Sequence, residues 1–263
     1  MKLRVALTAL ALGITAPALA ASAFDGTWKA DVASVKLPTK PDVILLANGV
    51  YSCSSCNPKL TVPADGAFHK VSNQNNYFDE AAVKVIDART IEETDKRKGR
   101  IVYTSTSRVA ADGKTQQIKW SDSAAPDGKT TTGVVNQMRV GAAAKGAHAV
   151  SGQWRTTSVG NISDADLTVS FATTGAIFKS STPNGYGYTA TLGGKPVSPI
   201  GDPSGMMTAV RKVDAMTVVE TNTRKGEMRS TRTMTVQPGG KTIKVDNVNK
   251  AQGTTTSYML TKQ

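Results

Sequence analysis

Hydrophobic and polar residues alternate with a period of two along much of this chain. In the segment 227–237, EMRSTRTMTVQ, the residues Arg232, Met234 and Val236 fall on one side of an extended strand and threonines fall on the other. The segment 100–110, RIVYTSTSRVA, is equally dense in β-branched residues. Helical spacing, with apolar residues at i, i+3, i+4 and i+7, is hard to find after the first twenty residues. The pattern predicts an all-β protein.

The chain contains an internal repeat. Sliding the sequence by 127 residues places 87–99, DARTIEETDKRKG, on 214–226, DAMTVVETNTRKG. With the offset shortened by one, FDGTWK at 24–29 falls on VSGQWR at 150–155. Each copy spans about 120 residues, the size of a small domain and far longer than a solenoid unit. The repeat predicts a first domain over residues 21–145 and a second over residues 146–263.

Glycine-containing pairs punctuate the strands of both copies. Two-residue hairpin turns need residues that tolerate positive φ, and the chain supplies them at Lys98-Gly99, Lys225-Gly226, Asp112-Gly113 and Gly239-Gly240. Strands joined by short turns form an up-and-down meander, which leaves exposed edges unless it closes on itself. We therefore expect two tandem antiparallel up-and-down β-barrels of about eight to ten strands each. The small-residue segment 140–151, VGAAAKGAHAVS, is expected to be a flexible joint between them.

The start of each copy resembles a known family. Gly26-Thr27-Trp28 and Gly152-Gln153-Trp154 are similar to the Gly-x-Trp that begins the first strand of lipocalins and other calycins. The resemblance implies that each tryptophan closes the base of its own barrel under a cation from the last strand of that copy. Arg139 would then cover Trp28, and Lys262 would cover Trp154, by a cation–π contact. The chain also resembles lipocalin-like exported bacterial proteins with two repeats, which loosely implies a hydrophobic ligand.

The first twenty residues have the features of a secretory signal peptide. Lys2 and Arg4 precede an apolar run, and small residues before Ala20 and Ala23 suit cleavage after either one. No later segment approaches the roughly 18 consecutive apolar residues that a transmembrane helix needs, so the mature chain is expected in the periplasm or outside the cell. The formal net charge of +12 falls by the charges of Lys2 and Arg4 to +10. A basic surface suits an anionic envelope as partner, although a solvated surface explains it too.

Cys53 and Cys56 are the only cysteines, and in an exported chain they can oxidise. Three extended residues span about 10 Å, so a bond between them requires a turn at Ser54-Ser55. We predict a structural disulfide. A redox centre would need a helix N-terminus at the first cysteine, and the surroundings are strand-like; free thiols and metal ligation remain alternatives.

The chain lacks a recognisable catalytic, metal or cofactor motif. The two histidines, His69 and His148, fit neither a zinc site nor a Ser-His-Asp arrangement. Glu92 and Glu93 point to opposite faces of a strand and so cannot share a substrate. We therefore expect no catalytic residues, no metal ligands and no cofactor. The cations at the hairpin tips, Lys96-Arg97-Lys98 and Arg224-Lys225, lack aromatic neighbours for base stacking, so no specific nucleic-acid binding is expected.

These observations favour an exported, non-enzymatic binding or envelope-associated protein that holds a small or lipidic molecule in a barrel. Two alternatives stay open. One is a structural or interaction module whose barrels are filled by side chains, and the other is an envelope enzyme that uses an interior acid or hydroxyl. The hypotheses differ in one structural expectation. The binding hypothesis requires a cavity of about 300 Å³ or more in at least one copy, whereas the structural module has barrels filled by side chains.

Overall fold

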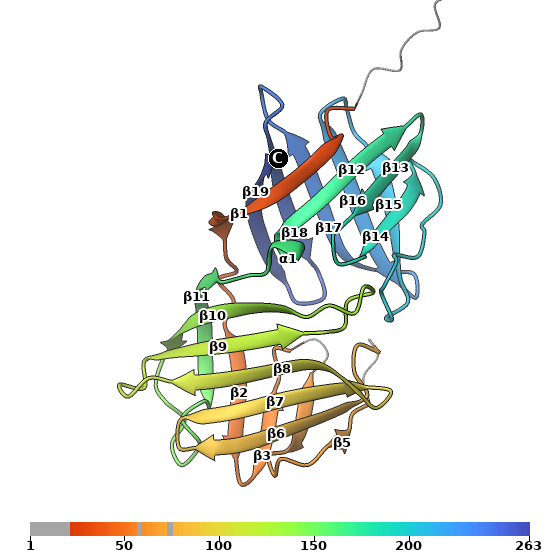
Figure 1. Ribbon diagram of the computed structural model, residues 1–263. Helices are drawn as coiled ribbons and strands as arrows, with labels where there is room; N and C mark the ends of the chain where they lie inside the picture. Colours follow the sequence, from red (N-terminus) through yellow and green to blue (C-terminus); the bar gives the residue numbers. More distant parts are fainter. Residues whose placement is uncertain (1–21, 57–58, 73–75) are drawn as a thin grey trace, which may run out of the picture.

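The computed structural model describes residues 22–56, 59–72 and 76–263, and it consists of two nearly closed antiparallel β-barrels (Figure 1). The all-β prediction is confirmed, because a single short helix, α1 (Asp164–Leu167), accompanies the strands in the described residues. The signal peptide expected over residues 1–20 lies outside the described residues. Within them, no helix combines the length and the apolar character that crossing a bilayer requires.

Barrel I, as we name the barrel that contains β2 to β11, is formed by one sheet of the described chain, in the order β4-β3-β2-β11-β10-β9-β8-β7-β6-β5. An isolated bridge between Asp65 and Lys84 brings its two edges together. Its strands are β2 (Asp42–Ala47), β3 (Val50–Cys53), β4 (Leu60–Pro63), β5 (His69–Lys70), β6 (Glu80–Asp87), β7 (Thr90–Arg97), β8 (Arg100–Val109), β9 (Thr115–Asp122), β10 (Thr131–Val140) and β11 (Gly152–Gly160).

Barrel II is formed by the other sheet, in the order β14-β13-β12-β1-β19-β18-β17-β16-β15 over the described residues. Bridges from Gly187 to Ile200 and from Val197 to Thr208 narrow the gap between its edges. Its strands are β1 (Gly26–Lys36), β12 (Thr168–Thr174), β13 (Ile177–Ser181), β14 (Gly187–Thr191), β15 (Met206–Lys212), β16 (Thr217–Arg224), β17 (Glu227–Val236), β18 (Thr242–Asn249) and β19 (Thr254–Lys262).

The first strands of the two repeats are exchanged between the barrels. β1 lies between β12 and β19 in barrel II, where Figure 1 shows it as a red strand among green and blue ones. β11 lies between β2 and β10 in barrel I. The predicted domain boundaries, 21–145 and 146–263, are corrected accordingly. The strands of barrel I lie within residues 42–160, and barrel II combines residues 22–36 with residues 161–263.

The connection after β10 accounts for this exchange. The segment 140–151, expected to be a flexible joint between domains, instead joins β10 to β11 within barrel I. Its end is fixed to β2, because His148 N–H donates to the Leu46 carbonyl oxygen (2.9 Å) and Ser151 Oγ accepts from Leu46 N–H (2.8 Å). Strands consecutive in sequence tend to pair, so β11 takes the place beside β10, and β1 fills the equivalent place in barrel II.

The two-residue turns predicted at Lys98-Gly99 and Lys225-Gly226 are confirmed, whereas Asp112-Gly113 and Gly239-Gly240 lie in the longer loops 110–114 and 237–241. Lys98 and Gly99 have φ values of 52° and 79°, and Lys225 and Gly226 have φ values of 52° and 81°. Positive φ at both central residues matches the right-handed twist of the flanking strands, which run from β7 to β8 and from β16 to β17.

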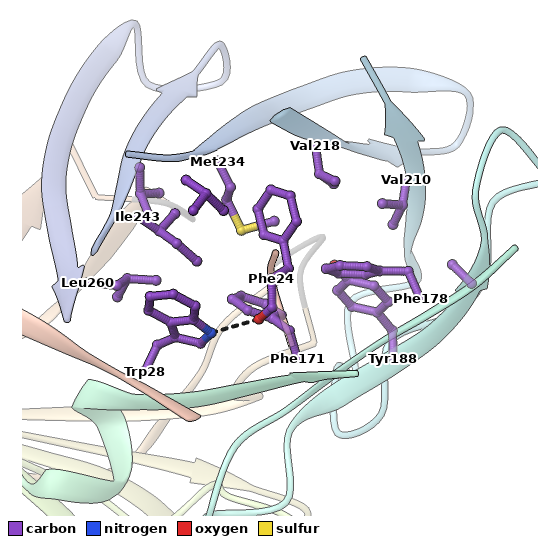
Figure 2. Packing of buried hydrophobic residues seen from close by; sticks show 13 residues of the cluster. Phe24, Trp28, Phe171, Phe178, Tyr188, Val210, Val218, Met234, Ile243 and Leu260 are labelled. Carbon is purple, nitrogen blue, oxygen red and sulfur yellow. Dashed lines mark hydrogen bonds between the residues drawn. The ribbon is translucent and has the colours of Figure 1, made fainter. Parts of the chain in front are cut away.

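Each barrel has its own apolar core, and each core includes the exchanged strand. Figure 2 shows the core of barrel II, in which Trp28 donates its Nε1–H to the carbonyl oxygen of Phe24 (2.7 Å). Trp154 makes the equivalent bond to the Val150 carbonyl oxygen (2.8 Å) in barrel I. Both indoles are fully buried. The exchange therefore keeps the environment of each tryptophan while changing the barrel to which it belongs.

Candidate functional site

The residues expected to close the barrels are brought together, but in exchanged pairs. Arg139 covers Trp154, with its Cζ 4.1 Å from the ring centroid, and Lys262 covers Trp28, with its Nζ 5.2 Å from the centroid. The expected pairs, Trp28 with Arg139 and Trp154 with Lys262, are therefore corrected. The cause is the strand exchange, since Arg139 stands opposite Trp154 in the register of β10 and β11, and Trp28 stands opposite Lys262.

The glycine of each Gly-x-Trp makes room for the cation. A Cβ on Gly152 would overlap Nη1 of Arg139, and a Cβ on Gly26 would lie 3.0 Å from Cε of Lys262. Arg139 also donates to three carbonyl oxygens, those of Gly113 (2.7 Å), Ser151 (2.6 Å) and Ala149 (2.6 Å). The guanidinium of Arg139 therefore has its hydrogen-bond acceptors within the protein. We assign these tryptophan–cation pairs a structural role at the barrel ends.

Cys53 and Cys56 form a disulfide, with their Cα atoms 5.4 Å apart. The turn between them is held by Ser55, whose Oγ accepts from Val43 N–H (2.8 Å), and by Ser54 N–H, which donates to the Val43 carbonyl oxygen (3.1 Å). The bond closes a turn at the end of β3, and the contacts of Ser54 and Ser55 with Val43 tie this turn to β2.

A candidate binding site is a cavity of about 700 Å³ inside barrel II. One wall is apolar and comes from β1, β12 and the connection after β11; it includes Val32, Ile162, Leu167 and Val169. The facing wall is polar and comes from β15 to β19; it includes Thr208, Asn222, Ser230, Asn247 and Thr256. The cavity is therefore amphipathic, and the exchanged strand β1 supplies part of its apolar side.

An ion pair between the partly exposed Arg232 and the buried Glu220 lies in the polar wall. Arg232 contacts one carboxylate oxygen of Glu220 through Nε (2.7 Å) and Nη2 (2.5 Å), and the Tyr188 hydroxyl donates to the other oxygen. Burial raises the pKa of Tyr188, and the charge of Glu220 adds to this effect. Burial disfavours the charge on Arg232, but Glu220 outweighs it and raises the pKa of the guanidinium. Both carboxylate oxygens of Glu220 thus already accept hydrogen bonds, whereas the guanidinium of Arg232 keeps N–H donors that face the cavity.

Barrel I differs from barrel II at the same level. The row of facing residues Glu220, Arg232, Asn247 and Thr256 across β16 to β19 corresponds to Glu93, Ser105, Trp120 and Gly133 across β7 to β10. A Cβ on Gly133 would overlap the indole of Trp120, so the glycine makes room for this ring. A partly buried indole therefore lies in barrel I where barrel II carries Asn247.

Because Ser105 stands where barrel II has Arg232, two acids of barrel I have no cation partner among the described residues. Glu93 and Asp95 are two residues apart on the inner face of β7, opposite Ser105 and Tyr103. Burial raises the pKa of Glu93 to about 7. Burial and the charge of Glu93 together raise the pKa of Asp95 to about 8. The equivalent residues of barrel II are Glu220 and Asn222, so barrel II has one acid fewer and a cation beside it.

Sequence reasoning missed both polar clusters. It compared the neighbours Glu92 and Glu93, whereas the residues that share a face are Glu93 and Asp95. The repeat could have revealed these acids. Glu93 and Glu220 coincide at the offset of 127, on strands whose inward-facing side chains are expected to be apolar. The hairpin cations also differ from the expected solvated tip, since Lys96 lies over the ring of Phe68 (3.5 Å) and Arg97 donates to the Ala124 carbonyl oxygen (3.4 Å).

The histidines lie at surface contacts of barrel I. His69 Nε2 is 2.9 Å from Oδ1 of Asp65, and His148 Nε2 is 2.7 Å from the carbonyl oxygen of Asp87. Neither belongs to the lining of the barrel II cavity in the described part of the chain. Searches of protein-family models, of curated proteins and of solved structures found no match to this chain.

Proposed function

We propose that this chain is an exported, non-enzymatic protein of the periplasm or the extracellular space that binds a small, uncharged amphipathic molecule inside barrel II. The observation that carries the proposal is the cavity of about 700 Å³, which retains open space beside the fixed Arg232–Glu220 pair. This volume falls within the range of about 300–1,000 Å³ that is usual for small-molecule sites.

The charges in the cavity support an uncharged ligand. Arg232 and Glu220 neutralise each other in the polar wall, and the other charged residues of the lining, Asp166 and Asp202, are acids that disfavour an anionic ligand. A carboxylate on the ligand would approach Glu220 as well as Arg232 and would be repelled by the buried acid. A hydroxyl or carbonyl group can accept a hydrogen bond from Arg232 without this penalty.

The two walls support an amphipathic shape. A fully apolar chain would cover the polar side chains of Asn247 and Thr256 without offering them a hydrogen bond, which costs free energy. A ligand with one polar edge can satisfy these groups and still contact Val32 and Val169 on the opposite wall. Rigid molecules with hydroxyl or carbonyl groups along one edge meet both demands.

Native mass spectrometry of the protein purified from its own cell envelope tests the proposal. The double variant Asn247→Trp with Thr256→Gly, the filled barrel II variant, gives barrel II the residues that barrel I has at Trp120 and Gly133. It should fold and lose the copurified molecule. Val248→Trp places the same ring on an exposed position of β18 and is the matched control. A wild-type protein that carries no molecule, or a filled variant that carries the same molecule as the wild type, contradicts the proposal.

A further inference from the structure

A second pocket lies at the end of barrel I that meets barrel II. Its volume is about 280 Å³. Barrel I contributes Asp95, Arg97, Tyr103 and Asp122 from β7, β8 and β9, together with residues that precede β6, and barrel II contributes Tyr186, Gly201 and Pro203. This pocket shares one lining residue, Tyr186, with the barrel II cavity that underlies the proposed function, and its other lining residues are its own.

One carboxylate oxygen in this pocket has no partner. Asp95 is only 5% exposed, and its Oδ1 makes no hydrogen bond among the described residues. Glu93, on the same face of β7, adds a second acid rather than a cation. A buried carboxylate without a hydrogen bond or a counter-charge is costly, so this position is poised to accept a proton or a cation.

Arg97 does not compensate Asp95. Its guanidinium donates to the Ala124 carbonyl oxygen (3.4 Å), and its charge acts on Asp122. Asp122 itself accepts from Ala124 N–H (2.7 Å). Arg97 is therefore associated with Asp122, while Oδ1 of Asp95 has no hydrogen-bond partner among the described residues.

Aromatic rings form much of the remaining lining, from Tyr77, Phe78, Tyr103 and Tyr186. Faces of aromatic rings attract cations, and rings combined with a carboxylate suit organic ammonium ions. Calcium prefers six to eight oxygen ligands, which this largely aromatic lining does not supply. We propose that the pocket binds a small organic ammonium ion, with Asp95 as its carboxylate partner and the tyrosines as its walls.

Calorimetric titration of the full chain with choline, compared with its uncharged isostere 3,3-dimethylbutan-1-ol, tests the charge requirement. Choline should bind saturably at about pH 9, and the neutral alcohol should bind at least about tenfold more weakly. Lowering the pH to about 6 should weaken choline binding about tenfold or more, because protons then occupy the acid. The groups that face Asp95 and share this titration are Tyr51, Glu93, Arg97, Tyr103 and Asp122.

Two variants locate the site. Asp95→Asn should weaken choline binding about tenfold or more, and Asp112→Asn, in an exposed turn, should leave it unchanged. Tyr186→Ala, on the barrel II side of the pocket, should weaken binding without changing β7 and so covers the case in which Asp95→Asn fails to fold. The filled barrel II variant should bind choline as the wild type does, which separates this proposal from the proposed function.

Three results would overturn the proposal. The first is the absence of saturable binding at about pH 9 by choline, tetramethylammonium and ethanolammonium alike. The second is equal binding of choline by the wild type and by a folded Asp95→Asn variant. The third is saturable binding of calcium that is lost in Asp95→Asn while choline shows none, which would assign the pocket to a metal ion.

Discussion

Lys262, the residue before the C-terminal one, lies over the indole ring of Trp28 near the start of the described chain, with its Nζ 5.2 Å from the ring centroid. The backbones of the two residues are paired in the register of β1 and β19. Barrel II is therefore completed only when both ends of the chain are present. Barrel I depends on neither end, because its own tryptophan and cation lie within residues 42–160.

The first prediction concerns fragments that respect or ignore the strand exchange. A fragment of residues 38–162 contains every strand of barrel I and should unfold cooperatively on heating. A fragment of residues 21–145, the unit suggested by the repeat, lacks β11 and should not, because β2 and β10 lose the strand between them. Circular dichroism with thermal melting measures both. Cooperative unfolding of 21–145 together with an unfolded 38–162 would show that the strands are not exchanged.

The second prediction compares the two cations at the barrel ends. Replacing Arg139 by Met removes three hydrogen bonds to carbonyl oxygens and a cation–π contact, and should lower the free energy of unfolding by about 3 kcal/mol. Replacing Lys262 by Met removes the longer contact with Trp28 and should cost about 1 kcal/mol or less. Urea unfolding of both variants gives the comparison. Equal losses would mean that the carbonyl contacts of Arg139 contribute little.

Much of the fold follows from the sequence, but the exchange of strands does not. Period-two alternation and the glycine turns predict strands and hairpins, since both are local properties of the chain. The two Gly-x-Trp strands carry the same local pattern, so the pattern alone does not assign either strand to a barrel. The choice depends on which connection brings a strand beside β10, and that is settled by contacts such as those of Ser151 with Leu46.

The polar clusters show the same limit. The coincidence of Glu93 with Glu220 is visible in the sequence, whereas the partner of each acid depends on the register between neighbouring strands. Glu220 faces Arg232, and Glu93 faces Ser105. Two differences, Arg232 against Ser105 and Asn222 against Asp95, therefore separate an acid with a cation partner from a pair of acids that have none among the described residues.

The third prediction is a loss of stability at alkaline pH caused by the acids of barrel I. The unfolded chain ionises these carboxyl groups at about pH 4, whereas the folded barrel holds the pKa of Glu93 at about 7 and that of Asp95 at about 8. Between these limits the folded state binds more protons than the unfolded state. Its stability should therefore decrease as the pH rises from about 4 to about 8.

Replacing both acids by their amides tests this. The variant Glu93→Gln with Asp95→Asn should be more stable than the wild type at about pH 8.5, by about 2 kcal/mol, and its stability should vary less with pH. Urea midpoints at about pH 5 and about pH 8.5 measure the difference. Asp112→Asn serves as the control for an exposed acid. A variant with the same dependence on pH as the wild type would locate the titration elsewhere.

The fourth prediction concerns the disulfide. Its loop is short, so removing it should lower the free energy of unfolding by only about 2 kcal/mol in the chain-entropy account. The variant Cys53→Ala with Cys56→Ala should fold, since Ser54 and Ser55 still hold the turn against Val43. Urea unfolding with and without a reductant measures the effect. A wild type unaffected by the reductant, with thiols shown to be free, would mean that the bond contributes nothing.

The fifth prediction tests the ion pair of barrel II. Replacing Arg232 by Met leaves the carboxylate of Glu220, which is 1% exposed, without its cation, and should lower the free energy of unfolding by about 3–5 kcal/mol. Adding Glu220→Leu should restore most of this loss, because two apolar side chains need no desolvation of charge. The double-mutant cycle in urea at about pH 7 isolates the coupling between the two residues. If Arg232→Met alone costs less than about 1 kcal/mol, water reaches Glu220 through the cavity and replaces the guanidinium, and the polar wall of barrel II is then hydrated rather than preorganised for a ligand.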